Sequence, residues 1–205
     1  MDIGEFKKQP LLGILRGIEL SMAEPLVSAI IDSGLKTIEI AMNTRGAADI
    51  IRKVVKLSRK RLVVGAGTVL DMASLKSALS AGASFMVMPV LVKDVTAYCV
   101  KNKIPCFPGA LTPQEIYAAW QAGAAMVKVF PCGMFGPAYF KEIKGPFNDI
   151  ELLACGGVTA KNLREYIVNG ASAASFGSSV FRNEWLAAGD YARISESIRQ
   201  FVRQF

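Results

Sequence analysis

Two charged residues stand inside apolar runs of this chain. Lys128 lies between two valines in "MVKVFP" (126–131), and Glu39 lies between two isoleucines in "TIEIAM" (37–42). Lysine and glutamate are rarely fully buried unless they are paired. The pair is therefore either a buried salt bridge without a chemical role or a catalytic set. A desolvated lysine beside another cation has a lowered pKa and attacks carbonyl carbons, and a nearby carboxylate can move protons.

The sequence contains no histidine, which excludes many kinds of active site. A Ser-His-Asp triad, a Cys-His pair and a histidine-ligated metal cannot form. The four cysteines form no C-x-x-C pair and lie in apolar surroundings, so we expect buried, reduced thiols. Lysine and glutamate without histidine or metal are the residues that Schiff-base chemistry needs.

Strand-like runs alternate with amphipathic, helix-like segments along the whole chain. This alternation predicts β-α-β units and a parallel sheet. The starts of the runs lie about 20 to 25 residues apart, and no linker divides the chain. The eight candidate strands are residues 12–17, 37–42, 62–68, 85–89, 104–109, 126–131, 151–157 and 173–178.

Eight such units in one domain, residues 1–205, predict an α/β fold of the TIM (β/α)8 barrel type with eight parallel strands. A doubly wound open sheet is the alternative. That fold usually carries a glycine-rich dinucleotide loop after its first strand, whereas "GAG" (65–67) follows the third and lacks the remaining spacing. The N-terminal residues 1–8 are expected to form a short helix that closes the floor of the barrel.

Strand periodicity places the candidate catalytic side chains. Alternate residues of a strand face opposite sides, and β-branched residues of a barrel strand face the surrounding helices. Glu39 and Lys128 should therefore both point into the barrel. Arg16 lies near the C-terminal end of the first strand, where active sites of this fold are assembled.

Glycine and serine clusters follow the last two strands. They are "CGGV" (155–158) and "FGSS" (176–179). In barrels of this fold, phosphate is often bound after strands 7 and 8 through backbone N–H groups. Each cluster alone would be an ordinary tight turn, but two at adjacent strand ends predict a phosphate site.

These motifs resemble the 2-keto-3-deoxy-6-phosphogluconate (KDPG) aldolase family, which includes 4-hydroxy-2-oxoglutarate (KHG) aldolases and 6-phosphogalactonate-specific aldolases. The resemblance runs in order from about residue 10 to residue 205. It implies a class I aldolase on a TIM barrel, usually a homotrimer, so we expect neither a metal nor a cofactor. The matching stretches are "ILRGI", "IEIAMNT", "VGAGTVL", "VKVFP", "GPAYFKEIKGPF", "LLACGGVTAKNL" and "FGSSVF".

The resemblance also implies roles for single residues. Lys128 matches the Schiff-base lysine, and Glu39 matches the acid–base glutamate. Thr68 matches a residue near the pyruvate carboxylate, and Arg16 matches an arginine that some members use to bind that carboxylate. The remaining matches are Pro89 and Phe130 in the pocket wall, and Gly156, Gly157, Gly177, Ser178 and Ser179 in the phosphate site.

Two positions depart from the gluconate-type pattern. Asn43 stands where many such members carry an arginine, and "MNT" and "FGP" look more like galactonate-type members. Arg16 is a candidate to replace that charge, and the stereochemistry at C4 of the substrate stays open. Cys155 stands where some members have a threonine.

Composition and charge limit the kinds of binding partner that we expect. The formal net charge is +7, which suits a small anionic substrate such as pyruvate or a phosphorylated 2-keto-3-deoxy acid. We expect no nucleic-acid partner, because no basic patch with stacking aromatics is visible. No apolar stretch reaches the roughly 18 residues of a membrane span, and no signal peptide is recognisable, so a cytoplasmic location is expected. The alternatives are a KHG aldolase, an isomerase or lyase of another phosphate-binding barrel family, and a non-enzymatic sugar-phosphate binder or scaffold.

Overall fold

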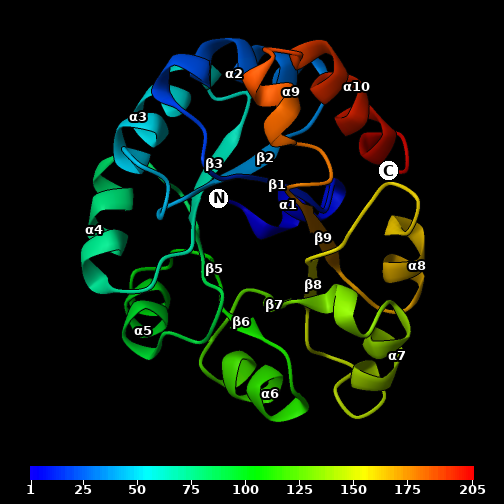
Figure 1. The fold of residues 1–205 in the computed structure, drawn as a ribbon. Helices are drawn as coiled ribbons and strands as arrows, with labels where there is room; N and C mark the ends of the chain where they lie inside the picture. The colour runs from blue at the N-terminus through cyan, green and yellow to red at the C-terminus, as the bar shows by residue number, and fades with distance from the viewer.

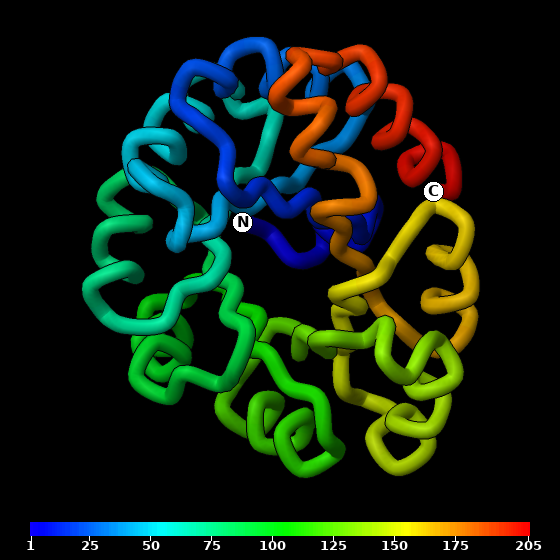
Figure 2. Tube along the Cα trace, in the orientation of Figure 1, coloured from blue at the N-terminus to red at the C-terminus, as the bar shows by residue number.

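The computed structural model describes residues 1–205 and contains nine parallel strands surrounded by helices. Figure 1 shows the strands near the centre and the helices around them, and Figure 2 shows the chain passing once around the ring. The strands are β1 (Leu11–Leu15), β2 (Thr37–Ala41), β3 (Val63–Gly67), β4 (Met86–Val87), β5 (Cys106–Phe107), β6 (Gly109–Ala110), β7 (Val127–Val129), β8 (Leu152–Cys155) and β9 (Ala173–Phe176).

The sheet curves into a nearly closed α/β barrel. Its order is β5-β4-β3-β2-β1-β9-β8-β7-β6, so the first and last strands of the chain are neighbours. The two ends of this order are consecutive in the chain, because only Pro108 separates β5 from β6. The N–H group of Lys128 donates to the Pro108 carbonyl at 2.9 Å, and that of Ala125 donates to the Cys106 carbonyl at 2.9 Å. The alternative of an open, doubly wound sheet is therefore wrong.

The strand count differs from the predicted eight. The candidate strand 104–109 appears as two short strands, β5 and β6, on either side of Pro108. Proline has no backbone N–H and cannot donate to a neighbouring strand, so the ladder is interrupted at this residue. The other seven candidate runs each hold one strand.

The helices lie between the strands in sequence and cover the barrel from outside (Figure 1). A capping box between Thr112 and Glu115 begins α6, with proline in the first turn. The bounds are α1 (Ile3–Lys8), α2 (Ala23–Asp32), α3 (Ala47–Ser58), α4 (Met72–Ser80), α5 (Lys93–Lys101), α6 (Pro113–Gln121), α7 (Ala138–Lys144), α8 (Leu163–Val168), α9 (Asn183–Ala187) and α10 (Tyr191–Val202), with 3₁₀ turns at Leu20–Met22 and Cys132–Met134.

The core has two parts. The larger part joins the outward faces of the strands to the helices and includes Ile38, Ile40, Val127 and Val129. The smaller part fills the inside of the barrel with Leu12, Phe85, Phe107 and other side chains, and Phe6 of α1 belongs to it. The expected helix at the barrel floor is thus confirmed.

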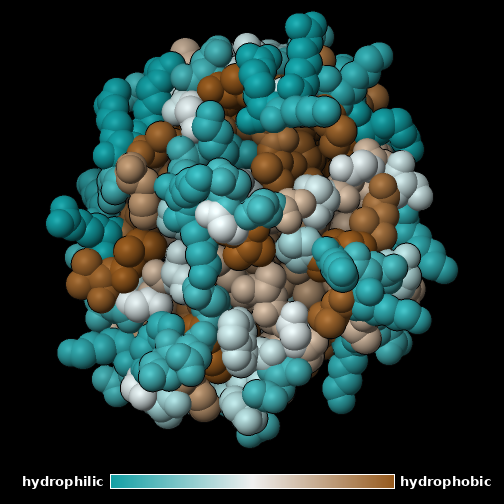
Figure 3. Space-filling model, turned by 180° about the vertical axis from the view of Figure 1, so that it is seen from behind, coloured by the Kyte–Doolittle hydropathy of each residue, from teal (hydrophilic) through white to brown (hydrophobic).

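The outer surface is mostly polar where it is seen from behind. In Figure 3, hydrophilic side chains cover most of the rim of this face, and apolar side chains lie between them toward the middle. None of the helices has the length and apolar character that crossing a membrane requires.

Candidate active site

Strand β7 turns Lys128 into the barrel. Its neighbours Val127 and Val129 pack outward, so the alternation of the strand leaves the lysine on the inner face. Only 4% of Lys128 is exposed. Its Nζ atom lies 5.0 Å from the centre of the Phe130 ring, close enough for a cation–π contact. The amine is thus removed from bulk water and sits at the wall of a cavity.

Strand β2 turns Glu39 into the same interior. Its exposure is 1%, and it pairs with Ile14 of β1 and Gly65 of β3 in the sheet. The carboxylate lies over Gly67, where a Cβ atom would come within 2.2 Å of Oε1. Glycine at position 67 therefore provides the space that the carboxylate occupies.

Glu39 and Lys128 form no ion pair in the structure. The Oε2 atom of Glu39 is buried and has no hydrogen-bond partner. Burial raises the pKa of the Glu39 carboxyl, while the positive charges of Lys128 and Arg16 act in the opposite direction. The interpretation of the two residues as a buried structural salt bridge is therefore wrong. A buried, unpaired carboxyl with a raised pKa is suited to proton transfer.

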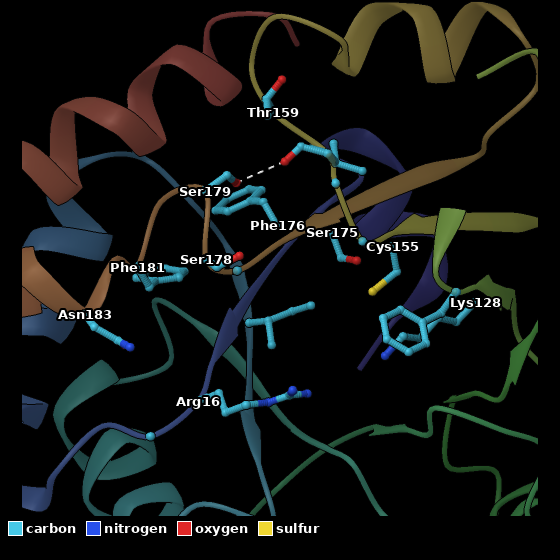
Figure 4. Close-up of a pocket in the computed structure, with 17 residues that line it drawn as sticks. Arg16, Lys128, Cys155, Thr159, Ser175, Phe176, Ser178, Ser179, Phe181 and Asn183 are labelled. Carbon is cyan, nitrogen blue, oxygen red and sulfur yellow. Dashed lines mark hydrogen bonds between the residues drawn. The ribbon is translucent and has the colours of Figure 1, made fainter. Parts of the chain in front are cut away.

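A cavity of about 550 Å³ opens at the C-terminal ends of β1, β7, β8 and β9. This is the end of the barrel where active sites of the fold lie. In Figure 4 the side chains of Arg16, just after β1, and Lys128 of β7 extend toward the same part of the cavity. The cavity therefore brings two positive charges together with polar groups of the last two strands.

Arg16 is held by contacts among three loops. Its Nη2 atom donates a hydrogen bond to the Thr68 hydroxyl after β3, at 3.4 Å. The next residue, Gly17, donates its backbone N–H to the hydroxyl of the buried Thr44 after β2, at 3.0 Å. The guanidinium is thus anchored at the mouth of the cavity, where it can bind a carboxylate.

The glycines after β8 form one side of an anion-binding cradle. Gly156 and Gly157 have φ angles of +93° and +82°, which side-chain-bearing residues rarely adopt. The Gly156 carbonyl accepts hydrogen bonds from the backbone N–H of Gly133 and the thiol of Cys132, which fixes the turn. The backbone N–H groups of Gly157 and Val158 are used by no hydrogen bond within the chain.

The turn after β9 forms the other side. The Gly177 carbonyl accepts from the N–H groups of Val180 and Phe181, while the N–H groups of Gly177, Ser178 and Ser179 donate to no group in the chain. The Ser179 hydroxyl donates to the Val158 carbonyl at 3.0 Å and joins the two turns (Figure 4). Free N–H groups from two joined turns can bind the oxygens of a phosphate.

Cys155 lies on the inner face of β8 and lines the cavity with Lys128. Burial raises the pKa of its thiol, and the positive charge of Lys128 acts in the opposite direction. We expect the group to be a neutral thiol at neutral pH.

Eight of the eleven predicted site residues line the main cavity, and three do not. Glu39 is buried within the barrel and Thr68 stands beside Arg16. Pro89 lines a neighbouring cavity of about 310 Å³, which shares Phe130 with the main one. The eight lining residues are Arg16, Lys128, Phe130, Gly156, Gly157, Gly177, Ser178 and Ser179.

Sequence reasoning did not assign several other residues that line the cavity, among them Ile14, Ser175, Phe181 and Asn183. Ile14 and Ser175 lie two positions before Arg16 and Gly177, so strand periodicity would have placed them on the inner face. Phe181 lies in the irregular segment after β9, where no periodic signal exists, and Asn183 is the first residue of α9. No three His, Cys, Asp or Glu side chains gather into a group that could hold a metal ion.

A family model described as "KDPG and KHG aldolase" matches residues 3–197. The chain belongs to this family. The resemblance seen in the sequence motifs is thereby confirmed. Among curated members of the family, the 2-dehydro-3-deoxy-6-phosphogalactonate aldolase of Escherichia coli (strain K12) is 33% identical, over 97% of this chain and 95% of that protein. The 2-dehydro-3-deoxy-phosphogluconate aldolase of Pseudomonas aeruginosa is 31% identical, over 88% of this chain and 82% of that protein.

A solved structure of a family member supports the same fold. The KDPG aldolase of Legionella pneumophila, with pyruvate captured at low pH as a covalent carbinolamine intermediate, superposes with a TM-score of 0.88. The two sequences are 25% identical, and the match covers 96% of this chain and 95% of the Legionella chain. The fold is therefore shared with this family over nearly the whole chain.

Proposed function

We propose that this protein is a class I, pyruvate-dependent aldolase that cleaves a 2-keto-3-deoxy-6-phospho sugar acid to pyruvate and glyceraldehyde 3-phosphate. The observation that carries the proposal is the burial of Lys128 at the wall of a polar cavity, without an acidic partner. Membership of an aldolase family supports it.

Lys128 is the nucleophile. Its unprotonated amine attacks the C2 carbonyl of the substrate to give a carbinolamine, which loses water to form an iminium ion. The iminium accepts the electron pair of the C3–C4 bond, so the bond breaks to an enamine and not to an unstabilised carbanion. Protonation of the enamine at C3 and hydrolysis of the resulting iminium release pyruvate and restore the lysine.

Glu39 moves the protons. As a carboxylate it takes the proton of the C4 hydroxyl through a water molecule, which lets the C4–O bond become a carbonyl as C3–C4 breaks. As a carboxylic acid it then returns a proton to C3 of the enamine. Burial raises its pKa and so makes the protonated form more accessible than in an exposed glutamate, which suits a group that accepts and then donates a proton.

Arg16 and the two cradle turns hold the ends of the substrate. Arg16, anchored by Thr68, binds the carboxylate next to the C2 carbonyl. The free N–H groups of Gly157, Ser178 and Ser179 bind the phosphate at the other end of the cavity. Fixing both ends aligns the C3–C4 bond with Lys128 and Glu39. Phe130 forms the wall beside the reacting carbons, and Pro89 borders it from the neighbouring cavity.

Three finer assignments belong to the same proposal. We count β5 and β6 as the halves of one strand, which makes the fold an eight-stranded TIM barrel in a single domain, residues 1–205. We propose a homotrimer in solution, to be measured by light scattering coupled to gel filtration. We also propose a cytoplasmic location, which fractionation of the producing cells would test.

The activity is tested by release of pyruvate from four substrates. Both C4 epimers of the phosphorylated acid, the non-phosphorylated acid and 4-hydroxy-2-oxoglutarate are each incubated with the protein and with Lys128→Met. We expect cleavage of at least one phosphorylated epimer by the native protein and none by the variant. Cleavage of 4-hydroxy-2-oxoglutarate alone would replace the substrate assignment. No cleavage by a folded native protein would favour a sugar-phosphate binder.

A further inference from the structure

A second cavity of about 430 Å³ lies on the outer side of the two cradle turns. Three separate segments bring positive side chains to it. Lys161 follows β8, Arg182 precedes α9, and Arg193 belongs to α10. We call this cavity the outer basic pocket, defined by these three residues and Trp185 of α9.

The two arginines are oriented by Trp185. The guanidinium carbon of Arg182 lies 4.7 Å from the centre of the Trp185 ring, and that of Arg193 lies 5.6 Å from it. Both distances fit cation–π contacts, which hold long side chains that would otherwise sample many rotamers. An ordered pair of guanidinium forks is the arrangement that binds oxyanions such as phosphate.

Positive charge exceeds negative charge in this pocket. Arg193 pairs with Asp190 at 3.3 Å, but Lys161 and Arg182 have no acidic partner. The one acidic side chain that lines the pocket, Glu196, accepts from Arg199 and Arg203 at 3.3 Å each. Like charges that converge without counterions repel one another, and a bound anion would remove that cost.

We propose that the outer basic pocket binds a phosphate dianion, free or as the ester of a small metabolite, and that this site is distinct from the catalytic cavity. A dianion matches the unpaired charges of Lys161 and Arg182, and Arg193 adds a third set of donors. The open shape of the pocket and its hydroxyl groups suit a small, hydrated ligand better than an apolar one.

The pocket shares a wall with the catalytic cavity. Thr159 and Ser179 line both, and in Figure 4 Thr159 points away from the side where Lys128 and Arg16 lie. The hydrogen bond from Ser179 to the Val158 carbonyl joins the two turns that form this wall. Two dianions on opposite sides of it repel each other. Occupation of the outer pocket should therefore raise KM for the phosphorylated substrate, and this coupling rests on the proposed function.

Binding is measured with inorganic phosphate by equilibrium dialysis, without substrate, so that the result does not depend on aldolase activity. The Ser178→Asp variant places a carboxylate in the cradle and should leave only the outer site. We expect one phosphate per chain in this variant and none after Arg182→Gln and Arg193→Gln are added. The paired Arg→Lys replacements keep the charge and should retain weaker binding. Glycerol phosphate should compete with phosphate in the Ser178→Asp protein.

Two results would overturn the proposal. One is a Ser178→Asp protein that is folded by circular dichroism and binds no phosphate. The other is phosphate binding that persists undiminished in the triple variant. The coupling between the two sites is tested separately with the Arg182→Gln/Arg193→Gln variant, which should retain kcat. In the native protein, phosphate should raise KM by more than simple competition at the cradle explains. The variant should lose this additional rise of KM.

Discussion

The carboxylate of Glu39 occupies the space that a side chain at position 67 would fill. A Cβ atom on Gly67 would lie 2.2 Å from Oε1 and 2.6 Å from the carboxyl carbon. Gly67 pairs with Ala41 in the ladder between β3 and β2, so neither backbone can move away without disturbing the sheet. The position of Glu39, the proposed proton carrier, thus depends on Gly67. This glycine lies two residues after Gly65, which pairs with Glu39 in the sheet.

Gly67→Ala should lower both stability and activity. The added methyl group must displace the Glu39 carboxylate or the strand, and overpacking of this kind costs about 1–3 kcal/mol of unfolding free energy. Displacement of the carboxylate should reduce kcat at least tenfold. Chemical denaturation and single-turnover pyruvate release measure the two effects.

The control for this prediction is a double-mutant cycle. Glu39→Ala removes the carboxylate, so Gly67→Ala should cost much less unfolding free energy in that background than in the native one. Equal costs in both backgrounds would mean that the clash with Glu39 does not govern position 67.

Glu39→Gln should stabilise the protein at neutral pH and nearly abolish turnover. Because burial raises the pKa of Glu39 in the folded state, ionisation disfavours folding. Below the ordinary glutamate range both states hold the proton and the cost is absent. The cost grows as pH rises from the ordinary glutamate pKa of the unfolded state to the raised pKa of the folded state, and is constant above that. The stability gain of the Gln variant should therefore appear with rising pH and vanish in acid.

Thermal melts of the native and Gln proteins across pH 4 to 8 measure this difference. Loss of proton transfer should reduce kcat by about 10²–10⁴-fold. Native kcat should fall on the acid side at a pH above the ordinary range of a glutamate. A stability difference that grew toward acid pH would contradict the raised pKa.

Thr44 should act through Arg16. Thr44→Val removes the hydroxyl that accepts from the Gly17 N–H and should cost about 1 kcal/mol of stability. The loop that carries Arg16 would then lose its anchor, so KM for pyruvate in the reverse reaction should rise several-fold with kcat little changed. Thr44→Ser keeps the hydroxyl and should restore KM. A Ser variant that behaves like Val would assign the effect to packing.

Ser178→Asp should weaken binding of the phosphate end of the substrate and leave the reaction at the carbonyl end unchanged. A carboxylate in the cradle repels phosphate, so KM for the phosphorylated substrate should rise at least tenfold. The reaction of pyruvate with Lys128 should be unchanged, because pyruvate has no phosphate. Initial-rate kinetics measure KM, and adduct formation measures the reaction of pyruvate with Lys128. Parallel loss of substrate binding and of adduct formation would argue that Ser178 supports the fold alone.

Strand periodicity predicted the central geometry of the site. It turned Lys128 and Glu39 inward because their strand neighbours are β-branched and pack against helices. The cradle was also predictable, since glycines after adjacent parallel strands meet at one end of a barrel. The helix at the barrel floor followed from position alone, and the structure confirms it through Phe6.

Other features depend on distances that no pattern encodes. The salt bridge between Lys128 and Glu39 was a reasonable alternative, and only the three-dimensional separation of the charges rejects it. Pro108 divides a strand because it has no N–H to donate to a neighbouring strand. The sequence alone does not show which neighbouring strand would have accepted that hydrogen bond. Phe181 lines the cavity from the irregular segment between β9 and α9, where sequence periodicity gives no side-chain direction.

The most direct test of the account is borohydride trapping with pyruvate, followed by mass mapping of the modified peptide. The Schiff-base mechanism predicts a stable reduced pyruvyl adduct on Lys128, formed by the native protein and absent from a folded Lys128→Met variant. A folded native protein that forms no adduct, or forms it on another lysine, would contradict the Schiff-base mechanism.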